Sequence, residues 1–242
     1  MSQPPKNDSN SLVPLSAESL DIKLPEPPPI LRPKDAERTR KAIMKHGAVT
    51  HDAKMVYERD ALPAILSTDS AGANQVVAEL AKDDYFRDGN KLFIYQPPIN
   101  RELSRRIQEP RDAYQLDRLR DAERCINSVR DAPELENRRL KLEARNRKEM
   151  PKVKQEVLKN ASSCISGEPL SKDAEVHHVK RVADSPDLAV EPGNMRPVNP
   201  PIHKLIHAEQ AHTPQALDEL SKREGWLQMP EHESSKQETK QD

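Results

Sequence analysis

The periodicity of apolar residues differs between successive segments of this chain. Residues 1–35 show no period of 2 or 3.6, and they hold eight of the 22 prolines, three of them consecutive at positions 27–29. A segment of this kind buries too little apolar surface to offset the entropy that it would lose on ordering. We therefore expect residues 1–35 to be a disordered, Pro-rich, extended tail.

Short apolar runs separated by turn signals follow in residues 36–108. A helix can begin around residues 35–38, and Ser70 can cap a second one. Residues 91–95 predict a strand after the turn Asp88-Gly89-Asn90. Two helices and a strand or hairpin predict a small mixed α/β unit, similar to a winged helix, whose role the pattern does not indicate.

Residues 109–160 form a highly charged region with a sparse helical stripe of apolar residues. Breaks are expected near Ala132-Pro133 and near Met150-Pro151, because proline interrupts a helix. In residues 141–160 seven Lys and Arg outnumber three Glu. This basic helix either follows a phosphate backbone or is simply a solvated helical face.

The pattern becomes compact in residues 161–228. It predicts a tight loop at 163–173, a strand at 174–179, a polar loop at 183–193, a second strand at 194–198 and then a helix. Asn199 would be the N-cap of that helix, with proline in its first turn. Thr213-Pro214 can begin a last short helix, anchored by Trp226. Residues 229–242 are polar and are expected to be disordered.

The amino-acid composition limits the classes of protein to which the chain can belong. Hydrophobic residues make up 34%, aromatic residues 3% and charged residues 33%, so only modest cores can form. The net charge of −1 does not exclude a nucleic-acid partner, whose footprint is a local patch. Two cysteines are too few for a disulfide framework, and no apolar run is long enough for a signal peptide or a membrane span. We expect a cytoplasmic protein with no membrane association, or one that is exported without a cleaved signal peptide.

Histidines are the chemically distinctive residues of the compact segment. His177 and His178 lie on the first predicted strand, and His203 and His207 are four residues apart on the predicted helix. That spacing places both helical imidazoles on one face, where a single metal ion can bind them. Glu175, two residues before His177, shares its face of the strand and can orient a ligand imidazole.

In identity, order and spacing these residues resemble the HNH, or ββα-metal (His-Me finger), endonucleases, most closely the catalytic domain of colicin-type DNases. In that family a Glu-x-His-His strand precedes an Asn at the turn before the second strand and a His-x-x-x-His helix. The resemblance covers residues 161–212, about a fifth of the chain. The matching residues are Glu175, His177, His178, Asn194, His203 and His207.

The resemblance implies a metal-dependent endonuclease that hydrolyses phosphodiester bonds, with double-stranded DNA as the expected partner. His178 would be the general base, supported in the catalytic set by Glu175 and by Asn194, which is expected to pin the loop between the strands. One divalent ion would be bound by His177, His203 and His207. Three His ligands favour Zn²⁺, with Mg²⁺, Mn²⁺ or Ni²⁺ as alternatives. The nearest cations by sequence that could contact phosphate are Lys180, Arg181, Arg196 and Lys204.

The sequence thus predicts an α+β, mostly helical chain with a C-terminal nuclease module at residues 161–228. Two other functions remain open. The chain could be a colicin-like toxin effector with an immunity protein as partner, or a non-catalytic, zinc-stabilised nucleic-acid-binding module. His178 argues against the second, because a metal bound by the other three histidines does not need it.

Overall fold

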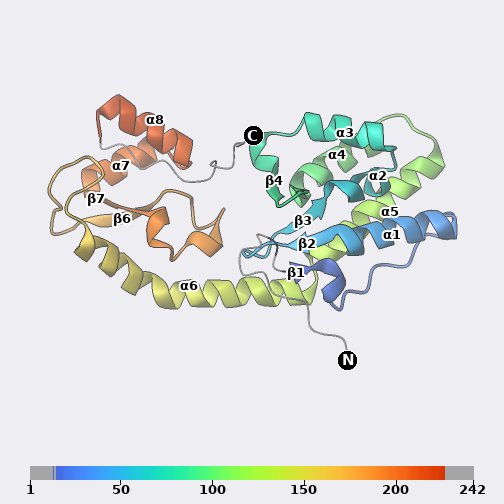
Figure 1. Cartoon of the computed structure of the whole chain (residues 1–242), viewed down its shortest axis with the longest axis horizontal. Coiled ribbons are helices and arrows are strands. Elements are labelled where there is room, and N and C mark those ends of the chain that lie inside the picture. Colours follow the sequence, from blue (N-terminus) through green and yellow to red (C-terminus); the bar gives the residue numbers. More distant parts are fainter. Residues whose placement is uncertain (1–12, 14, 227–242) are drawn as a thin grey trace, which may run out of the picture. The chain divides into compact units, whose positions relative to one another are not determined.

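The computed structural model describes residues 13 and 15–226 as a mixed chain of helices and strands that is mostly helical, as predicted (Figure 1). The chain divides after Lys141 into two compact units, here called unit 1 and unit 2. Within the described residues, no helix combines the length and hydrophobicity needed to cross a membrane.

Unit 1 is built on an antiparallel sheet whose strands follow the order β1-β2-β3-β5-β4. The strands are β1 (Leu15–Ser16), β2 (Gly47–Val49), β3 (Met55–Glu58), β4 (Tyr85–Asp88) and β5 (Lys91–Tyr95). The predicted turn at residues 88–90 joins β4 to β5, with Gly89 at a φ of 57°. Glycine reaches this left-handed conformation without steric strain, so it allows the tight hairpin.

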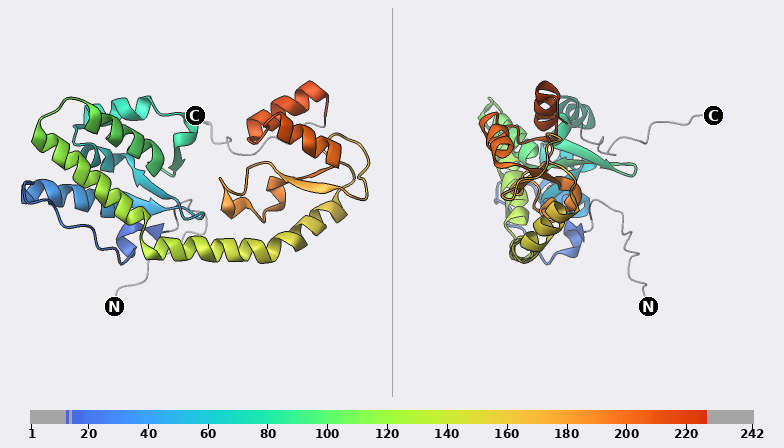
Figure 2. Two further views of the ribbon diagram at one scale, coloured as in Figure 1. Left: turned by 180° about the vertical axis from the view of Figure 1, so that it is seen from behind. Right: turned by 90° about the vertical axis from the view of Figure 1, so that its left-hand side faces the viewer.

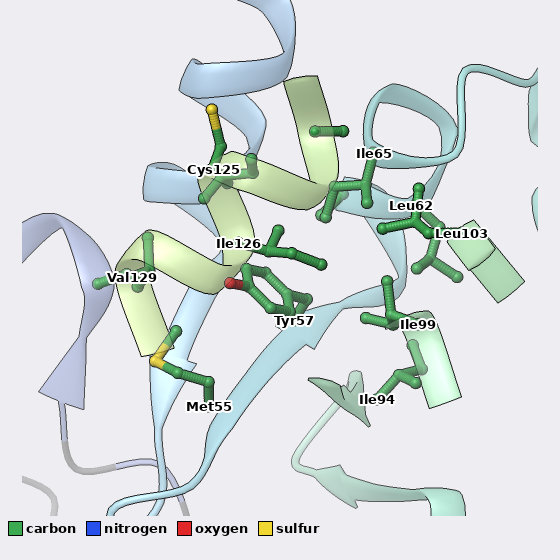
Figure 3. Close-up of a cluster of buried hydrophobic side chains, with 14 of the residues drawn as sticks. Met55, Tyr57, Leu62, Ile65, Ile94, Ile99, Leu103, Cys125, Ile126 and Val129 are labelled. Carbon is green, nitrogen blue, oxygen red and sulfur yellow. The ribbon is translucent and has the colours of Figure 1, made fainter. Parts of the chain in front are cut away.

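The helices of unit 1 pack on this sheet and on one another. They are α1 (Pro33–His46), α2 (Leu62–Ile65), α3 (Ser70–Ala78), α4 (Gln96–Gln108), α5 (Ala113–Arg130) and the start of α6 (Pro133–Asn160). Helix α5 packs against α1 and α4, and Figures 1 and 2 show α1 and α5 side by side. Figure 3 shows Cys125, Ile126 and Val129 of α5 among the buried side chains around Tyr57.

The structure divides the chain differently from the sequence prediction. Residues 36–108 do not form a unit of their own, because the apolar stripe of α5 completes their core and Leu135 of α6 is buried in the same cluster. The expected charged region 109–160 is therefore split between unit 1 and unit 2. The sparse stripe of α5 suffices because small and branched side chains from several elements meet it.

The predicted disorder of residues 1–35 does not hold for the part that the structure describes. Leu15 pairs with Val49, Ala17 is fully buried, and the Arg40 guanidinium donates a hydrogen bond of 2.8 Å to the Pro25 carbonyl. These partners lie far along the chain, so the local pattern could not reveal them. Residues 1–12 and 14 lie outside the described residues, as does the predicted tail at 229–242.

The two breaks expected around α6 have different outcomes. The break at Ala132-Pro133 is confirmed, since α5 ends at Arg130 and α6 begins at Pro133. The break at Met150-Pro151 is wrong, because α6 continues through Pro151. Proline removes the bond to the carbonyl four residues earlier, that of Arg147. Helix α6 therefore persists with one backbone hydrogen bond fewer.

Unit 2 has the strand, loop, strand and helix order predicted for it. Its elements after α6 are β6 (Glu175–His178), β7 (Met195–Val198), α7 (Pro200–Ala208) and α8 (Pro214–Glu224), with short 3₁₀ turns at Pro186–Leu188 and Pro192–Asn194. Strands β6 and β7 pair antiparallel, with His177 opposite Arg196. Thr213 caps α8 by accepting a hydrogen bond from Ala216, and Trp226 packs on the core of the unit, as expected.

Asn199 is the N-cap residue of α7, but its side chain does not cap the helix. Its Oδ1 accepts a 2.9 Å hydrogen bond from the Ser171 amide, and its Nδ2 donates one of 3.1 Å to the Pro169 carbonyl. The backbone amide of Asn199 donates to the sulfur of Cys164 at 3.3 Å. Asn199 and Cys164 thus fix the 163–173 loop against the start of α7.

Tyr114 joins α5 to the beginning of α1 in unit 1. Its hydroxyl donates a 2.5 Å hydrogen bond to the Asp35 carboxylate and accepts one of 3.1 Å from the Arg32 amide. This hydroxyl lowers the pKa of Asp35 against the opposing effect of burial, and nearby arginines add to the lowering. A lowered carboxyl pKa contributes stability above the unfolded-state value, and that contribution is lost as the pH falls through the folded-state value.

Tyr114→Phe should therefore lower the free energy of unfolding of unit 1 by about 1 kcal/mol at pH 7, the usual effect of one partly exposed hydrogen bond. The difference from wild type should shrink as the pH falls toward the lowered folded-state pKa of Asp35, because the protonated carboxyl no longer gains from the Tyr114 hydroxyl. Urea unfolding at pH 7 and pH 3 measures both values, with Tyr85→Phe as a control for hydroxyl removal. An equal difference at both pH values would contradict this account.

Candidate metal centre

Three imidazoles converge in unit 2. Ring nitrogens of His177, His203 and His207 all lie within 4.8 Å of one another, so the group could hold a metal ion. His177 is buried on β6, while His203 and His207 stand one turn apart on α7. The ring centroids of His203 and His207 are 4.7 Å apart, and each lies less than 6 Å from that of His177, at 5.4 and 5.8 Å. The predicted ligand set is thus brought together.

The hydrogen bonding of this group fits a metal ion. Nε2 of His177 is buried without a hydrogen-bond partner among the described residues, which costs on the order of 1–3 kcal/mol. Nε2 of His207 lies 3.1 Å from Nε2 of His203, so two nitrogens face the same space. A divalent ion between the three imidazoles would satisfy these lone pairs. Three neutral imidazoles leave a coordination position open, as in catalytic zinc sites.

Burial keeps the most enclosed imidazole neutral. It lowers the pKa of His177 to about 4, and the neighbouring His203 and His207 add to the lowering. The pKa of His207 is lowered as well, again by burial first and then by neighbouring imidazoles. Metal binding requires deprotonated ligands, so at neutral pH His177 already has the form in which it can bind an ion.

Glu175 orients one of the three imidazoles. Its carboxylate Oε2 bonds with Nδ1 of His203, from one end of β6 to α7. A carboxylate only accepts, so Nδ1 of His203 carries the hydrogen and Nε2 keeps its lone pair toward the other imidazoles. This is the contact that the sequence predicts for Glu175. Its membership of a catalytic set stays a prediction.

His178 has a different kind of partner from its neighbour His177. Its Nε2 lies 2.9 Å from the Ala189 carbonyl, which can only accept, so Nε2 carries the hydrogen. Nδ1 then holds the lone pair, with no partner among the described residues. Burial lowers the pKa of His178, the bond to Ala189 opposes this, and the positive charge of Lys154 lowers it further. His178 is therefore a neutral imidazole with a fixed tautomer at neutral pH.

Asn194 holds the loop that supplies the Ala189 carbonyl. Its buried side chain accepts a 2.7 Å hydrogen bond from the Lys180 amide and donates to the carbonyls of Lys180 and Leu188 at 3.0 and 3.1 Å. Both ends of the loop between β6 and β7 are thereby fixed through one side chain. This is the loop contact expected of Asn194, which acts on His178 only through Leu188 and its neighbour Ala189.

A pocket of about 410 Å³ lies over these histidines and includes residues that the sequence did not single out. His212 lines it, with its ring centroid 5.3 Å from that of His207. The turn after α7, with Gln210 at a φ of 53°, presents His212 beside the helix. Lys154 of α6 lines it as well, together with Arg181, which the sequence did single out. The five-residue spacing of His207 and His212 across a turn carries no recognisable signal, and Lys154 is one of seven similar cations in its segment.

The other cations near the motif in sequence do not line this pocket. The Arg196 guanidinium donates to the carbonyls of Gly193 and Met195 at 2.9 and 2.8 Å, so it braces the turn before β7. Lys180 and Lys204 are exposed. Arg181 is therefore the only one of the four sequence candidates that the structure places at the pocket.

Comparison of the chain with protein-family models, with curated proteins and with solved structures finds no match. The chemistry that the site can perform is therefore inferred from its own residues and geometry.

Loss of a metal ligand should be visible directly by titration calorimetry with Zn²⁺. His203→Ala and His207→Ala should each weaken binding at least about 100-fold, because loss of a supporting contact alone costs roughly 10–100-fold. Glu175→Gln should fall within that smaller range, and His178→Ala should bind Zn²⁺ like wild type. Unchanged affinity in both helical variants would remove α7 from the metal site.

Proposed function

We propose that unit 2 is a metal-dependent endonuclease of the HNH type that hydrolyses phosphodiester bonds of DNA. The observation that carries the proposal is the pairing of His178 with the Ala189 carbonyl beside a group of three convergent imidazoles. A metal ion held by those three does not need a fourth histidine with a fixed tautomer and an unused Nδ1. A general base needs both properties.

Each histidine has a separate role in this proposal. Nδ1 of His178 takes a proton from the attacking water, and the Ala189 carbonyl stabilises the positive charge that then develops on the imidazole. The water oxygen bonds to phosphorus, the bond from phosphorus to the 3′ oxygen breaks, and solvent protonates that oxygen. His177, His203 and His207 would hold the divalent ion, with Zn²⁺ favoured by their chemistry. When bound, the ion supplies positive charge beside the phosphate and the leaving oxygen.

The remaining residues position these groups. Glu175 fixes the rotation and tautomer of His203, so that its Nε2 faces the other two imidazoles. Asn194 fixes the loop and with it the acceptor of His178. Neither side chain takes part in bond breaking, so we expect their substitution to lower the rate less than loss of His178 does.

A non-catalytic zinc module is the competing function for the same residues. Structural zinc sites in proteins are closed by four protein ligands. Here the group that could hold an ion has three members, and a pocket opens beside it. This arrangement favours catalysis over a structural role.

A supercoiled-plasmid nicking assay tests the proposal. The full chain should convert supercoiled to open-circular DNA when loaded with a divalent ion, and a chelator should stop it. His178→Ala should lower the rate by about 10²–10⁴-fold, the usual contribution of a general base, while one metal equivalent stays bound. His51→Ala, a histidine of unit 1, is the matched control and should nick at the wild-type rate.

Two outcomes would overturn this account. Undiminished nicking by His178→Ala would show that His178 is not the base. A protein that binds the ion and is stabilised by it, yet cleaves neither strand with Zn²⁺, Mg²⁺, Mn²⁺ or Ni²⁺, would be the non-catalytic module instead.

A further inference from the structure

One lysine of helix α6 is less exposed than the other cations of residues 141–160. Its residues 141–160 hold seven Lys and Arg, and all but Lys154 are exposed. Lys154 is half-buried and shares its helical face with Met150, Val153 and Val157, which are also partly buried. These residues follow the i, i+3, i+4, i+7 pattern of a helix face turned toward the interior. Lys154 is thus held in unit 2 by the packing of α6.

Among the described residues that line its pocket, Lys154 meets no negative charge. It forms no ion pair among the described residues, whereas Arg147 pairs with Glu143 at 2.6 Å and Lys152 with Glu156 at 3.9 Å. It lines the pocket of the metal centre, whose other side chains are imidazoles, two valines and Arg181. No carboxylate is part of that lining. Taking a cation partly out of water without a partner is costly, so this environment is suited to an anion.

The position of Lys154 in the pocket indicates which kind of anion it would bind. Lys154 and His178 line the same pocket. Its helix is also tied to the loop between β6 and β7, because Asn146 donates a 2.5 Å hydrogen bond to the Pro186 carbonyl. An anion bound by Lys154 would lie in the pocket that His178 lines, where the proposed reaction needs the phosphate.

We propose that Lys154 is a phosphate-binding residue of this site and contacts the backbone phosphate of the nucleic acid beside His178. This inference rests on the proposed function, since it assigns the anion to the substrate. Arg181 supports the same subsite from the loop after β6, although it also faces Asp184 at 3.7 Å. The six exposed cations of residues 141–160 are then a solvated face and do not follow the phosphate backbone.

Three variants of the full chain test the role of Lys154. Lys154→Gln removes the charge, Lys154→Arg keeps it, and Lys152→Gln removes an exposed charge two residues away as the matched control. Binding is measured by fluorescence anisotropy with a labelled DNA duplex over a range of KCl concentrations, and cleavage by plasmid nicking. Thermal unfolding with Zn²⁺ checks that each variant is folded.

Lys154→Gln should reduce the slope of log affinity against log salt by about 0.9, the value for one lost phosphate contact. Its kcat/KM for nicking should fall about 10-fold or more, because a charge contact to the reacting phosphate is lost. Lys154→Arg should keep most of the wild-type salt slope and most of the wild-type kcat/KM. The kcat/KM of Lys152→Gln should match that of wild type within about twofold. A merely structural role of Lys154 would not change the salt slope.

The outcomes separate this inference from the proposed function. Wild-type nicking together with equal slopes and rates for Lys154→Gln and Lys152→Gln would overturn the role of Lys154 and leave the nuclease intact. If the wild-type chain does not nick DNA, the proposed function fails, and the salt slope alone decides whether Lys154 binds phosphate. Equal slopes in that case would overturn both.

Discussion

The packing of α7 against the β6–β7 hairpin is the constraint on which the candidate site depends. Ile206 is fully buried in the core of unit 2, next to the fully buried Val198 of β7. His203 lies one turn before Ile206 and His207 directly follows it, so the two imidazoles share a helical face beside the buried one. Burial of Ile206 therefore sets the rotation of α7 and brings both imidazoles to His177. Truncating such a core side chain typically lowers the free energy of unfolding by about 2–5 kcal/mol, so the rotation of α7 is strongly favoured over others.

Polar contacts then give two adjacent histidines different environments. His177 and His178 are neighbours in sequence. Nε2 of His177 is buried beside two other imidazoles with no hydrogen-bond partner in the described part of the chain, whereas His178 is tied to a backbone carbonyl. The difference arises from the loop between the strands, which Asn194 fixes at both ends. A site for a metal ion and a site for proton transfer can thus occupy one short strand.

Much of the candidate site could be predicted because its signals are local. The His-x-x-x-His spacing, the prolines after Asn199 and the polar loop before Asn194 each encode a turn, a cap or a helical face within a few residues. The strands β6 and β7 and the helix α7 consequently appear where the sequence predicts them. The contacts of Glu175 with His203 and of Asn194 with Lys180 join residues that are 28 and 14 positions apart, and they form once these elements pack together.

What the sequence did not reveal depends on partners that are distant along the chain. Ala17 is buried because its short 3₁₀ turn packs against α1 and β2, and α5 belongs to unit 1 because it packs on α1 and α4. Lys154 is distinguished from six similar cations by the packing of its helix face alone. The continuity of α6 through Pro151 shows that an exposed helix can lose one backbone bond to proline and persist.

The chemical identity of the cut ends tests the central claim most directly. Attack of water on phosphorus with departure of the 3′ oxygen leaves a 5′ phosphate and a 3′ hydroxyl, the ends that DNA ligase joins. Open-circular plasmid produced by the metal-loaded full chain should therefore be resealed by ligase after the protein is removed. Nicks that ligase cannot seal, or no nicks with any of the four divalent ions, would contradict the account.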